Sequence, residues 1–312
     1  MKKFRVIFMG TPEFAVPCLA ALYEHCEVIG VVTQPDKPRG RGQKLVPSPV
    51  KAWAAAHDLP VWQPKKIKDE EFTSFLEAQK PELMVVVAFG QILSQRILDI
   101  PTYGCINVHG SLLPRYRGAA PMQWCVINGE KKTGITTMFM DAGLDTGDML
   151  LKEEFPIGED TTLEDVHDGL MKLGAKVLMD TLEKLSDGTL QRIPQTGESN
   201  YAPMLDKETG HIHWQDSAQH IHNLVRGLDS WPGAYTFLAG KKYKIWRTKQ
   251  TDEKTEAAPG TILTADKKKG LFAATGDGVL EITELQAPGK KRMKACDYLN
   301  GHAIALPAVF EE

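Results

Sequence analysis

The first half of the chain alternates short apolar runs with amphipathic stretches. Residues 4–9 and 27–33 are rich in β-branched and aromatic side chains, and between them Thr11-Pro12-Glu13 is a signal for the start of a helix. A strand, a helix and a second strand in this order predict a parallel sheet with right-handed crossovers. Further strands are expected at 83–89, 104–109, 135–140 and 149–155, and helices at 48–57, 69–79, 91–98, 119–127 and 160–185.

The C-terminal third follows a different pattern. The stretch that ends at Asp206 is polar and interrupted by Gly and Pro, and a helix is expected at 218–228. Short β-like runs occur at 211–214, 235–238, 243–247, 260–263, 271–274 and 280–285. Short strands at near-regular spacing predict a small barrel of the oligonucleotide-binding (OB) kind. The sequence therefore predicts an α/β protein with a Rossmann-like parallel-sheet domain at 1–189, a linker at 190–206 and an OB-like β-barrel domain at 207–312.

Composition narrows the class of protein. The chain has 312 residues, 42% of them hydrophobic and 25% charged, as expected for a soluble globular protein of two domains. No apolar stretch approaches the roughly 20 residues that span a bilayer, so no membrane partner is expected. The apolar run near the N-terminus ends at Gly10 without a cleavage site, which predicts a strand rather than a secretion signal. The five cysteines form no C-x-x-C motif, which favours buried thiols in the cytoplasm over zinc or disulfides. A monomer is expected.

Charge is unevenly distributed along the chain. Residues 207–312 contain 15 Lys and Arg residues and 13 Asp and Glu residues. Residues 1–206 contain 22 Lys and Arg residues and 27 Asp and Glu residues, so the C-terminal third is the more basic part. The stretch 34–49 has four prolines, two glycines and four cations, and predicts a long mobile loop. Most charged stretches are connectors that contact only solvent. For this loop, contact with a polyanion fits at least as well as a solvated connector, because its charge is almost entirely of one sign.

Candidate chemistry begins at the end of the strand expected at 104–109. Asn107 and His109 are two residues apart, so both side chains project from the same face of the strand. An Asn amide donates hydrogen bonds, and a His transfers protons near neutral pH. A His near a strand end is often only a hydrogen-bonded structural residue. Here the glycine, apolar and basic residues of the following loop, 110–118, favour a ligand site at the carboxyl edge of the sheet.

A carboxylate completes the candidate constellation. Asp145 lies between Gly143 and Gly147, which allow a tight loop against another backbone. If two strands of one parallel sheet bring Asp145 to Asn107 and His109, the carboxylate fixes the imidazole and the amide donates to an oxyanion. No Ser or Cys nucleophile belongs to the set, because Cys105 is about 13 Å from His109 along a strand. Direct transfer of an acyl group between two bound substrates fits these residues.

A metal and a dinucleotide are both disfavoured as cofactors. The acidic residues Asp141, Asp145 and Asp148 do not have the spacing of a calcium-binding loop. The turn after the first strand lacks the G-x-G-x-x-G fingerprint of a dinucleotide site. No metal is therefore expected.

Several motifs of this sequence resemble those of the 10-formyltetrahydrofolate-dependent formyltransferases. The resemblance rests on Asn107-Val-His109-Gly-Ser-Leu-Leu-Pro114-Arg-Tyr-Arg117-Gly-Ala-Ala-Pro121 and Met140-Asp-Ala-Gly-Leu-Asp145-Thr-Gly-Asp148. It extends over nearly the whole chain and includes Gly10-Thr-Pro12, Trp231-Pro232 and Ala274-Thr-Gly-Asp-Gly278. The core motif is shared by members with different acceptors. The basic loop and the C-terminal barrel favour the members that formylate initiator methionyl-tRNA.

The resemblance implies a role for each motif. Asn107 and His109 would bind the developing oxyanion, and Asp145 would orient His109 and help to remove the proton of the attacking amine. The folate of the co-substrate, 10-formyltetrahydrofolate, would contact Ser111, Leu112, Leu113 and Pro114. The tRNA would contact Arg39, Arg41 and Lys44, with the basic stretches 267–269 and 290–294 of the C-terminal domain.

Two other readings stay open. The same core could formylate a small amine such as glycinamide ribonucleotide or a sugar nucleotide, or could transfer the formyl group to water. A non-catalytic RNA-binding module would use the barrel and the basic loop, but it leaves Asn107, His109 and Asp145 unexplained.

Overall fold

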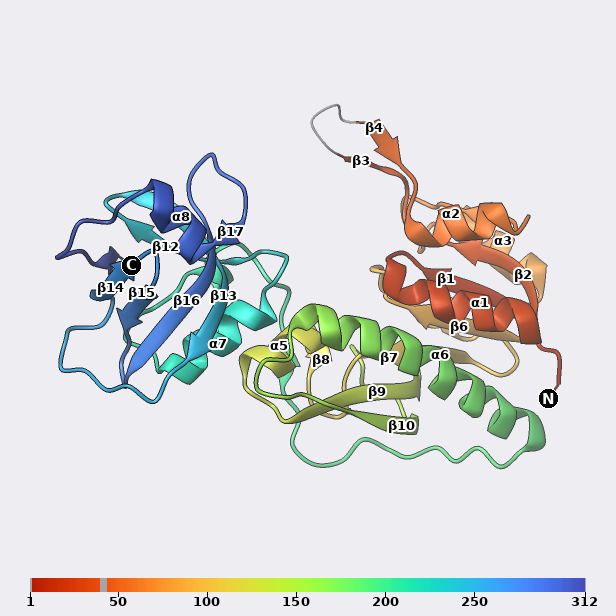
Figure 1. Ribbon diagram of the computed structural model, residues 1–312. Coiled ribbons are helices and arrows are strands. Elements are labelled where there is room, and N and C mark those ends of the chain that lie inside the picture. The colour runs from red at the N-terminus through yellow and green to blue at the C-terminus, as the bar shows by residue number, and fades with distance from the viewer. Residues whose placement is uncertain (1, 40–43, 312) are drawn as a thin grey trace. The chain divides into compact units, whose positions relative to one another are not determined.

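The computed structural model describes residues 2–39 and 44–311 (Figure 1). Two compact units are present, and neither is continuous in sequence. The first comprises Met1–Gly118, Thr133–Pro156 and His167–Ala202, and the second Ala119–Lys132, Ile157–Val166 and Pro203–Glu312. The domain limits expected at 189 and 207 stay a prediction.

A seven-stranded sheet forms the centre of the first unit, in the order β10-β9-β7-β6-β1-β2-β5. Its strands are β1 Arg5–Gly10, β2 Glu27–Val32, β5 Val61–Trp62, β6 Leu83–Val87, β7 Cys105–His109, β9 Lys132–Phe139 and β10 Met149–Pro156. Strands β5, β2, β1, β6 and β7 pair in parallel, which confirms the Rossmann-like prediction. β6 is buried at every position, as a central strand covered on both faces should be. β9 instead pairs antiparallel with β7.

The first unit also contains several helices. They are α1 Val16–His25 after the short 3-10 helix Glu13–Ala15, α2 Pro49–Ala56, α3 Glu70–Gln79, α4 Gln95–Leu98 and α6 Leu163–Asp187. At α2 the Ser48 side chain accepts a hydrogen bond from the Lys51 backbone N–H, and Pro49 takes the first helical position. The prediction of a helix at 91–98 was wrong for its first turn. The Gln91 side chain accepts from the Ile67 backbone, and a helix begins only after Ser94.

Part of the basic stretch 34–49 forms strands where a loop was expected. Strands β3 Lys37–Arg39 and β4 Lys44–Val46 pair antiparallel as a short ribbon, with Arg39 opposite Lys44. Arg41 lies outside the described residues.

The second unit is built around an antiparallel sheet in the order β14-β15-β16-β13-β12-β18, with β17 paired to β16. Its strands are β12 Ala234–Leu238, β13 Lys241–Gln250, β14 Ile262–Asp266, β15 Gly270–Ala274, β16 Val279–Gln286, β17 Met293–Lys294 and β18 Phe310–Glu311. The backbone at 308–311 bonds to β12 on one side and to 260–262 on the other, which joins the two ends of the sheet. The OB-like prediction is therefore confirmed.

Helices α5 Pro121–Ile127, α7 Ala218–Gly227 and α8 Ala295–Gly301 pack with this barrel, and α8 was not predicted. The strand expected at 211–214 was wrong. Only His211 makes a single bridge to Tyr235, and Trp214 is buried in the core with its indole N–H donating to Thr236. Among the described residues no helix is long and apolar enough to cross a membrane.

Candidate active site

Strand β7 presents two polar side chains on one face. It lies between β6 and β9, where Asn107 is opposite Met138 and His109 is opposite Thr136. Asn107 is half-buried, whereas His109 is 5% exposed. The alternation expected from the sequence therefore places both side chains where it predicted them.

Asp145 reaches the same place by a different route from the one expected. Because β9 is antiparallel to β7, the chain leaves β9 beside Cys105, at the far end of β7, and must fold back. The Asp141 side chain closes the turn by accepting from the Gly143 N–H (3.0 Å) and the Thr146 hydroxyl (2.6 Å). At Gly147 any Cβ would lie 1.8 Å from the Phe139 carbonyl oxygen. The Asp141 side chain therefore stabilises the turn of this loop, and at Gly147 the loop backbone packs closely against the Phe139 carbonyl oxygen.

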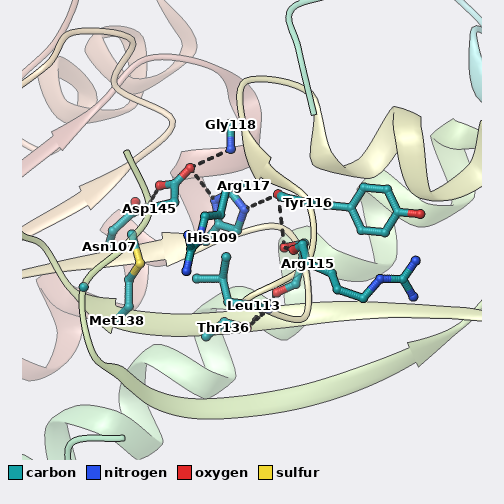
Figure 2. Close-up of polar contacts among 12 residues, drawn as sticks. Asn107, His109, Leu113, Arg115, Tyr116, Arg117, Gly118, Thr136, Met138 and Asp145 are labelled. Carbon is teal, nitrogen blue, oxygen red and sulfur yellow. Dashed lines mark hydrogen bonds and ion pairs between the residues drawn. The ribbon is translucent and has the colours of Figure 1, made fainter. Parts of the chain in front are cut away.

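The three side chains converge at the end of β7 (Figure 2). Asp145 Oδ2 lies 3.7 Å from His109 Nδ1 and accepts a hydrogen bond of 2.8 Å from the Gly118 N–H. Asp145 Oδ1 lies 3.5 Å from Asn107 Nδ2. Asp145 itself has a left-handed backbone with φ 55°, an uncommon conformation for a residue with a side chain. The carboxylate is thus fixed by one strong backbone bond and two longer side-chain contacts.

His109 is oriented from both sides of its ring. Nε2 donates to the Tyr116 carbonyl oxygen at 2.9 Å, while Nδ1 faces Asp145 (Figure 2). Because a carbonyl oxygen only accepts hydrogen bonds, the Nε2 atom carries a proton. The contacts of Nδ1 and of the Asn107 amide with Asp145 are long, so the site places an imidazole and an amide beside a carboxylate.

The loop after His109 is supported from within. The Ser111 hydroxyl is fully buried and donates to the Arg115 carbonyl oxygen at 2.7 Å. The Leu113 side chain is 1% exposed and packs with Met138 and Met149. Leu112 and Pro114 are half-buried and keep part of their surface accessible. That these four residues contact a folate stays a prediction.

Cys105 is not available as a nucleophile. Its thiol lies 3.8 Å from the Leu98 carbonyl oxygen, and burial raises its pKa to about 12. Within the described residues no group of three or more His, Cys, Asp and Glu side chains could hold a metal ion.

Sequence reasoning missed residues of the predicted linker. Gln195 and Asn200 bond to the two loops that carry Asp145 and Tyr116, through contacts with Asp145, Gly147, Tyr116 and Arg117. These partners lie about 50 to 84 positions away in the chain, and polar residues in a polar segment give no local signal.

Two of the basic stretches expected to contact RNA belong to the second unit. In the stretch 267–269 the backbone N–H groups of Lys268 and Lys269 donate to Asp266 at the turn between β14 and β15. In the stretch 290–294 Arg292 forms ion pairs with Glu284 and Asp229. A cavity of about 440 Å³ in the second unit is lined by several cationic side chains, among them Arg226, Arg247, Lys249 and Arg292.

Comparison with known proteins gives a family. The family model described as formyl transferase matches residues 2–182, and the model of the formyl transferase C-terminal domain matches residues 204–303. The methionyl-tRNA formyltransferase of Acetivibrio thermocellus is 54% identical over 303 residues, which cover 96% of this chain and 97% of that protein. The protein of the same name from Geobacter sulfurreducens is 54% identical over 306 residues, which cover 97% and 96%.

Solved structures are similar in fold. The N-formyltransferase of Helicobacter canadensis, in complex with folinic acid and dTDP-3-aminofucose, has a TM-score of 0.66 at 18% identity and covers 91% of this chain and 99% of its own. HypX of Aquifex aeolicus in complex with tetrahydrofolic acid has a TM-score of 0.64 at 17% identity and covers 96% of this chain and 47% of its own. From the two family models and the relatives that match along nearly their whole length, this chain belongs to the formyl transferase family.

Proposed function

We propose that this protein transfers the formyl group of 10-formyltetrahydrofolate to the α-amine of initiator methionyl-tRNA. The observation that carries the proposal is the convergence of Asn107, His109 and Asp145 at one end of β7, in a chain that is 51 to 54% identical to several methionyl-tRNA formyltransferases. Such a transfer supplies the formylated initiator of translation.

The donor set fits a formyl group. A carbonyl oxygen that gains negative charge needs hydrogen-bond donors already in place, and an attacking amine needs an acceptor for its proton. The Asn107 amide and the His109 ring provide the donors, and the Asp145 carboxylate provides the acceptor. No nucleophilic side chain belongs to the set, which favours direct transfer between the two substrates over a covalent enzyme intermediate.

The chemistry divides among the three residues. The Asn107 amide and the Nδ1–H of a protonated His109 donate to the oxygen of the formyl group as the amine adds to the formyl carbon, while His109 Nε2 keeps its bond to the Tyr116 carbonyl oxygen. Asp145 keeps His109 in its orientation and balances its charge, and helps to take the proton that the amine loses. The folate nitrogen then leaves with the electrons of the broken C–N bond and takes up a proton.

We assign the two substrates to different surfaces. On the folate side, the accessible parts of Leu112 and Pro114 offer apolar contact, while Ser111 and Leu113 support the loop from inside. On the tRNA side, Arg39, Arg41 and Lys44 belong to a basic stretch whose described part forms the β3–β4 ribbon. The second unit adds a cavity whose lining combines Arg and Lys side chains with Asp160 and Glu284.

We further propose that the protein works as a monomer in the cytoplasm. The five cysteines, all within the described residues, are thiols rather than disulfides, as expected for a reducing compartment. Light scattering coupled to gel filtration measures the mass directly.

A competition assay tests the activity. The protein is incubated with 10-formyltetrahydrofolate, charged initiator tRNA and glycinamide ribonucleotide, and the formylated products are separated. We expect formyl-methionyl-tRNA alone. Formylation of the small amine would keep the site and overturn the acceptor, and release of formate without either acceptor would indicate a hydrolase. His109→Ala should abolish the transfer and serves as the control for a contaminating enzyme.

A further inference from the structure

The segment 192–202, expected to be a linker, runs along the candidate site. Its Ile193 pairs with Met149 through two backbone hydrogen bonds of 2.9 Å. Strand β11, Tyr201–Ala202, pairs in parallel with β8, Arg117–Gly118, in the loop after His109. One segment therefore contacts both loops from which the site is built.

Gln195 makes the central contact of this segment. Its Nε2 donates to the carbonyl oxygens of Asp145 and Gly147, each at 2.8 Å. Its Oε1 accepts from the Arg117 guanidinium, from Nε at 3.0 Å and from Nη2 at 2.7 Å. Two donors and two acceptor positions are the whole capacity of an amide side chain. Gln195 is half-buried between the exposed Pro194 and Thr196, so its side chain turns inward from a surface segment.

These bonds complete a ring of contacts around Asp145. The Asp145 carboxylate accepts from the Gly118 N–H, and Gly118 follows Arg117 in the chain. Arg117 bonds to Gln195, and Gln195 bonds back to the Asp145 carbonyl oxygen. Asp145 is held by this ring in a left-handed backbone conformation, which persists only where its surroundings determine it.

We infer that Gln195 is a positioning residue for the Asp145 carboxylate. It does not reach the reacting groups, and it acts by holding the backbone from which Asp145 projects. The inference rests on the proposed formyl transfer. A shift of about 1 Å in a catalytic group lowers rates by about 100-fold, so loss of the Gln195 donors should reduce turnover strongly.

Three variants separate the parts of this role. Gln195→Ala removes all four bonds. Gln195→Glu keeps the shape and the acceptor for Arg117 but cannot donate to the carbonyl oxygens of Asp145 and Gly147. Gln191→Ala is the matched control, because Gln191 is an exposed glutamine immediately before this segment. We expect both Gln195 variants to lower the single-turnover transfer rate by about 10- to 100-fold, with KM for tRNA within about threefold of the wild type. Gln191→Ala should keep the wild-type rate.

A double-mutant cycle with Asp145→Asn shows whether Gln195 acts through Asp145. If it does, Gln195→Ala should change the residual rate of Asp145→Asn by less than about threefold. A further loss as large as in the wild-type background would overturn the inference, because a general structural effect does not depend on Asp145. A wild-type rate in Gln195→Ala would overturn it too, and so would one in Gln195→Glu, which would show that only the bond to Arg117 matters.

Thermal unfolding and tetrahydrofolate affinity are measured for each variant first. If Gln195→Ala does not fold, Gln195→Met, which keeps the length of the side chain, replaces it in every comparison. A wild-type protein that does not formylate the tRNA would refute the proposed function. An active wild type with an equally active Gln195 variant would refute the positioning role alone.

Discussion

Substitution of Gly147 by Ala tests whether the geometry of the Asp145 loop controls the rate. A Cβ at this position would lie 1.8 Å from the Phe139 carbonyl oxygen, and real Cβ atoms essentially never approach within 3.0 Å. The loop must therefore move by about 1.2 Å (3.0 − 1.8 Å). The displaced contact is a strand backbone, which cannot rotate away as a side chain can. Gly147 follows Asp145 by two residues, so the carboxylate should move by a similar distance.

The size of the effect follows from this displacement. A shift of about 1 Å corresponds to a loss of about 100-fold in rate, or about 2.7 kcal/mol of transition-state stabilisation. Insertion of a methyl group into a filled space destabilises a fold by about 1–3 kcal/mol. We expect kcat for formyl transfer to fall by about two orders of magnitude, while the protein stays folded at 25 °C.

Two control variants isolate the cause. At Gly143 a Cβ would meet the Thr146 hydroxyl, the end of a side chain that can rotate, at 2.0 Å. Gly143→Ala should therefore have the smaller effect on kcat. Gly301 has open space around it, so Gly301→Ala should match the wild type. Rates are measured with saturating 10-formyltetrahydrofolate, and folding is followed by circular dichroism. If Gly147→Ala retained more than half of the wild-type kcat, the idea that this loop must hold Asp145 in place would be refuted.

Three further predictions concern the site, the RNA and the barrel. Asn107→Ala should lower kcat by about 10²–10³ with the unfolding temperature unchanged, because it removes an oxyanion donor, and steady-state kinetics with calorimetry measure both. Arg41→Ala should raise KM for tRNA more than KM for folate and reduce the salt dependence of tRNA binding, as titrations at several salt concentrations would show. Burial lowers the pKa of His222 in the folded protein below its ordinary value of 6.5, so as the pH falls His222 is protonated in the unfolded chain before it is protonated in the folded protein. The contribution of neutral His222 to the free energy of unfolding is complete above pH 6.5 and is lost as the pH falls below that value, by at most about 1.4 kcal/mol per pH unit. In urea unfolding at several pH values, His222→Gln should flatten this dependence.

Local patterns in the sequence predicted the first half of the site. The period of two along a strand places Asn107 and His109 on one face whatever lies around them. Four of the parallel strands (β1, β2, β6 and β7) and the barrel followed from apolar runs and turn signals in the same way, whereas β5, which has only two residues, was not predicted. The meeting of Asp145 with these two residues was also predicted, but the route was wrong. A strand pattern does not state its direction, and β9 turned out to be antiparallel.

The remaining part of the site depends on contacts that leave no local pattern. Gln195 bonds to the backbone oxygens of Asp145 and Gly147, 50 and 48 positions earlier in the chain. Any residue type supplies a carbonyl oxygen, so no partner residue marks the contact. The short α4 has a similar cause, because the Gln91 side chain bonds to the Ile67 backbone before a helix can form.

The way in which the site is held determines what its variants should show. The cores of the two units contain the large buried side chains, such as Phe8 and Trp214, and most of the free energy of folding comes from that burial. The Asp145 loop contributes little to this free energy, because it is held by the Gln195 amide, the Gly118 backbone N–H and the close approach of Gly147 to a strand backbone. Loss of one of these contacts should therefore lower the rate of transfer strongly and change the unfolding temperature little. A core substitution such as Phe8→Ala should show the opposite balance, losing about 3–5 kcal/mol of stability, while the molecules that stay folded turn over normally.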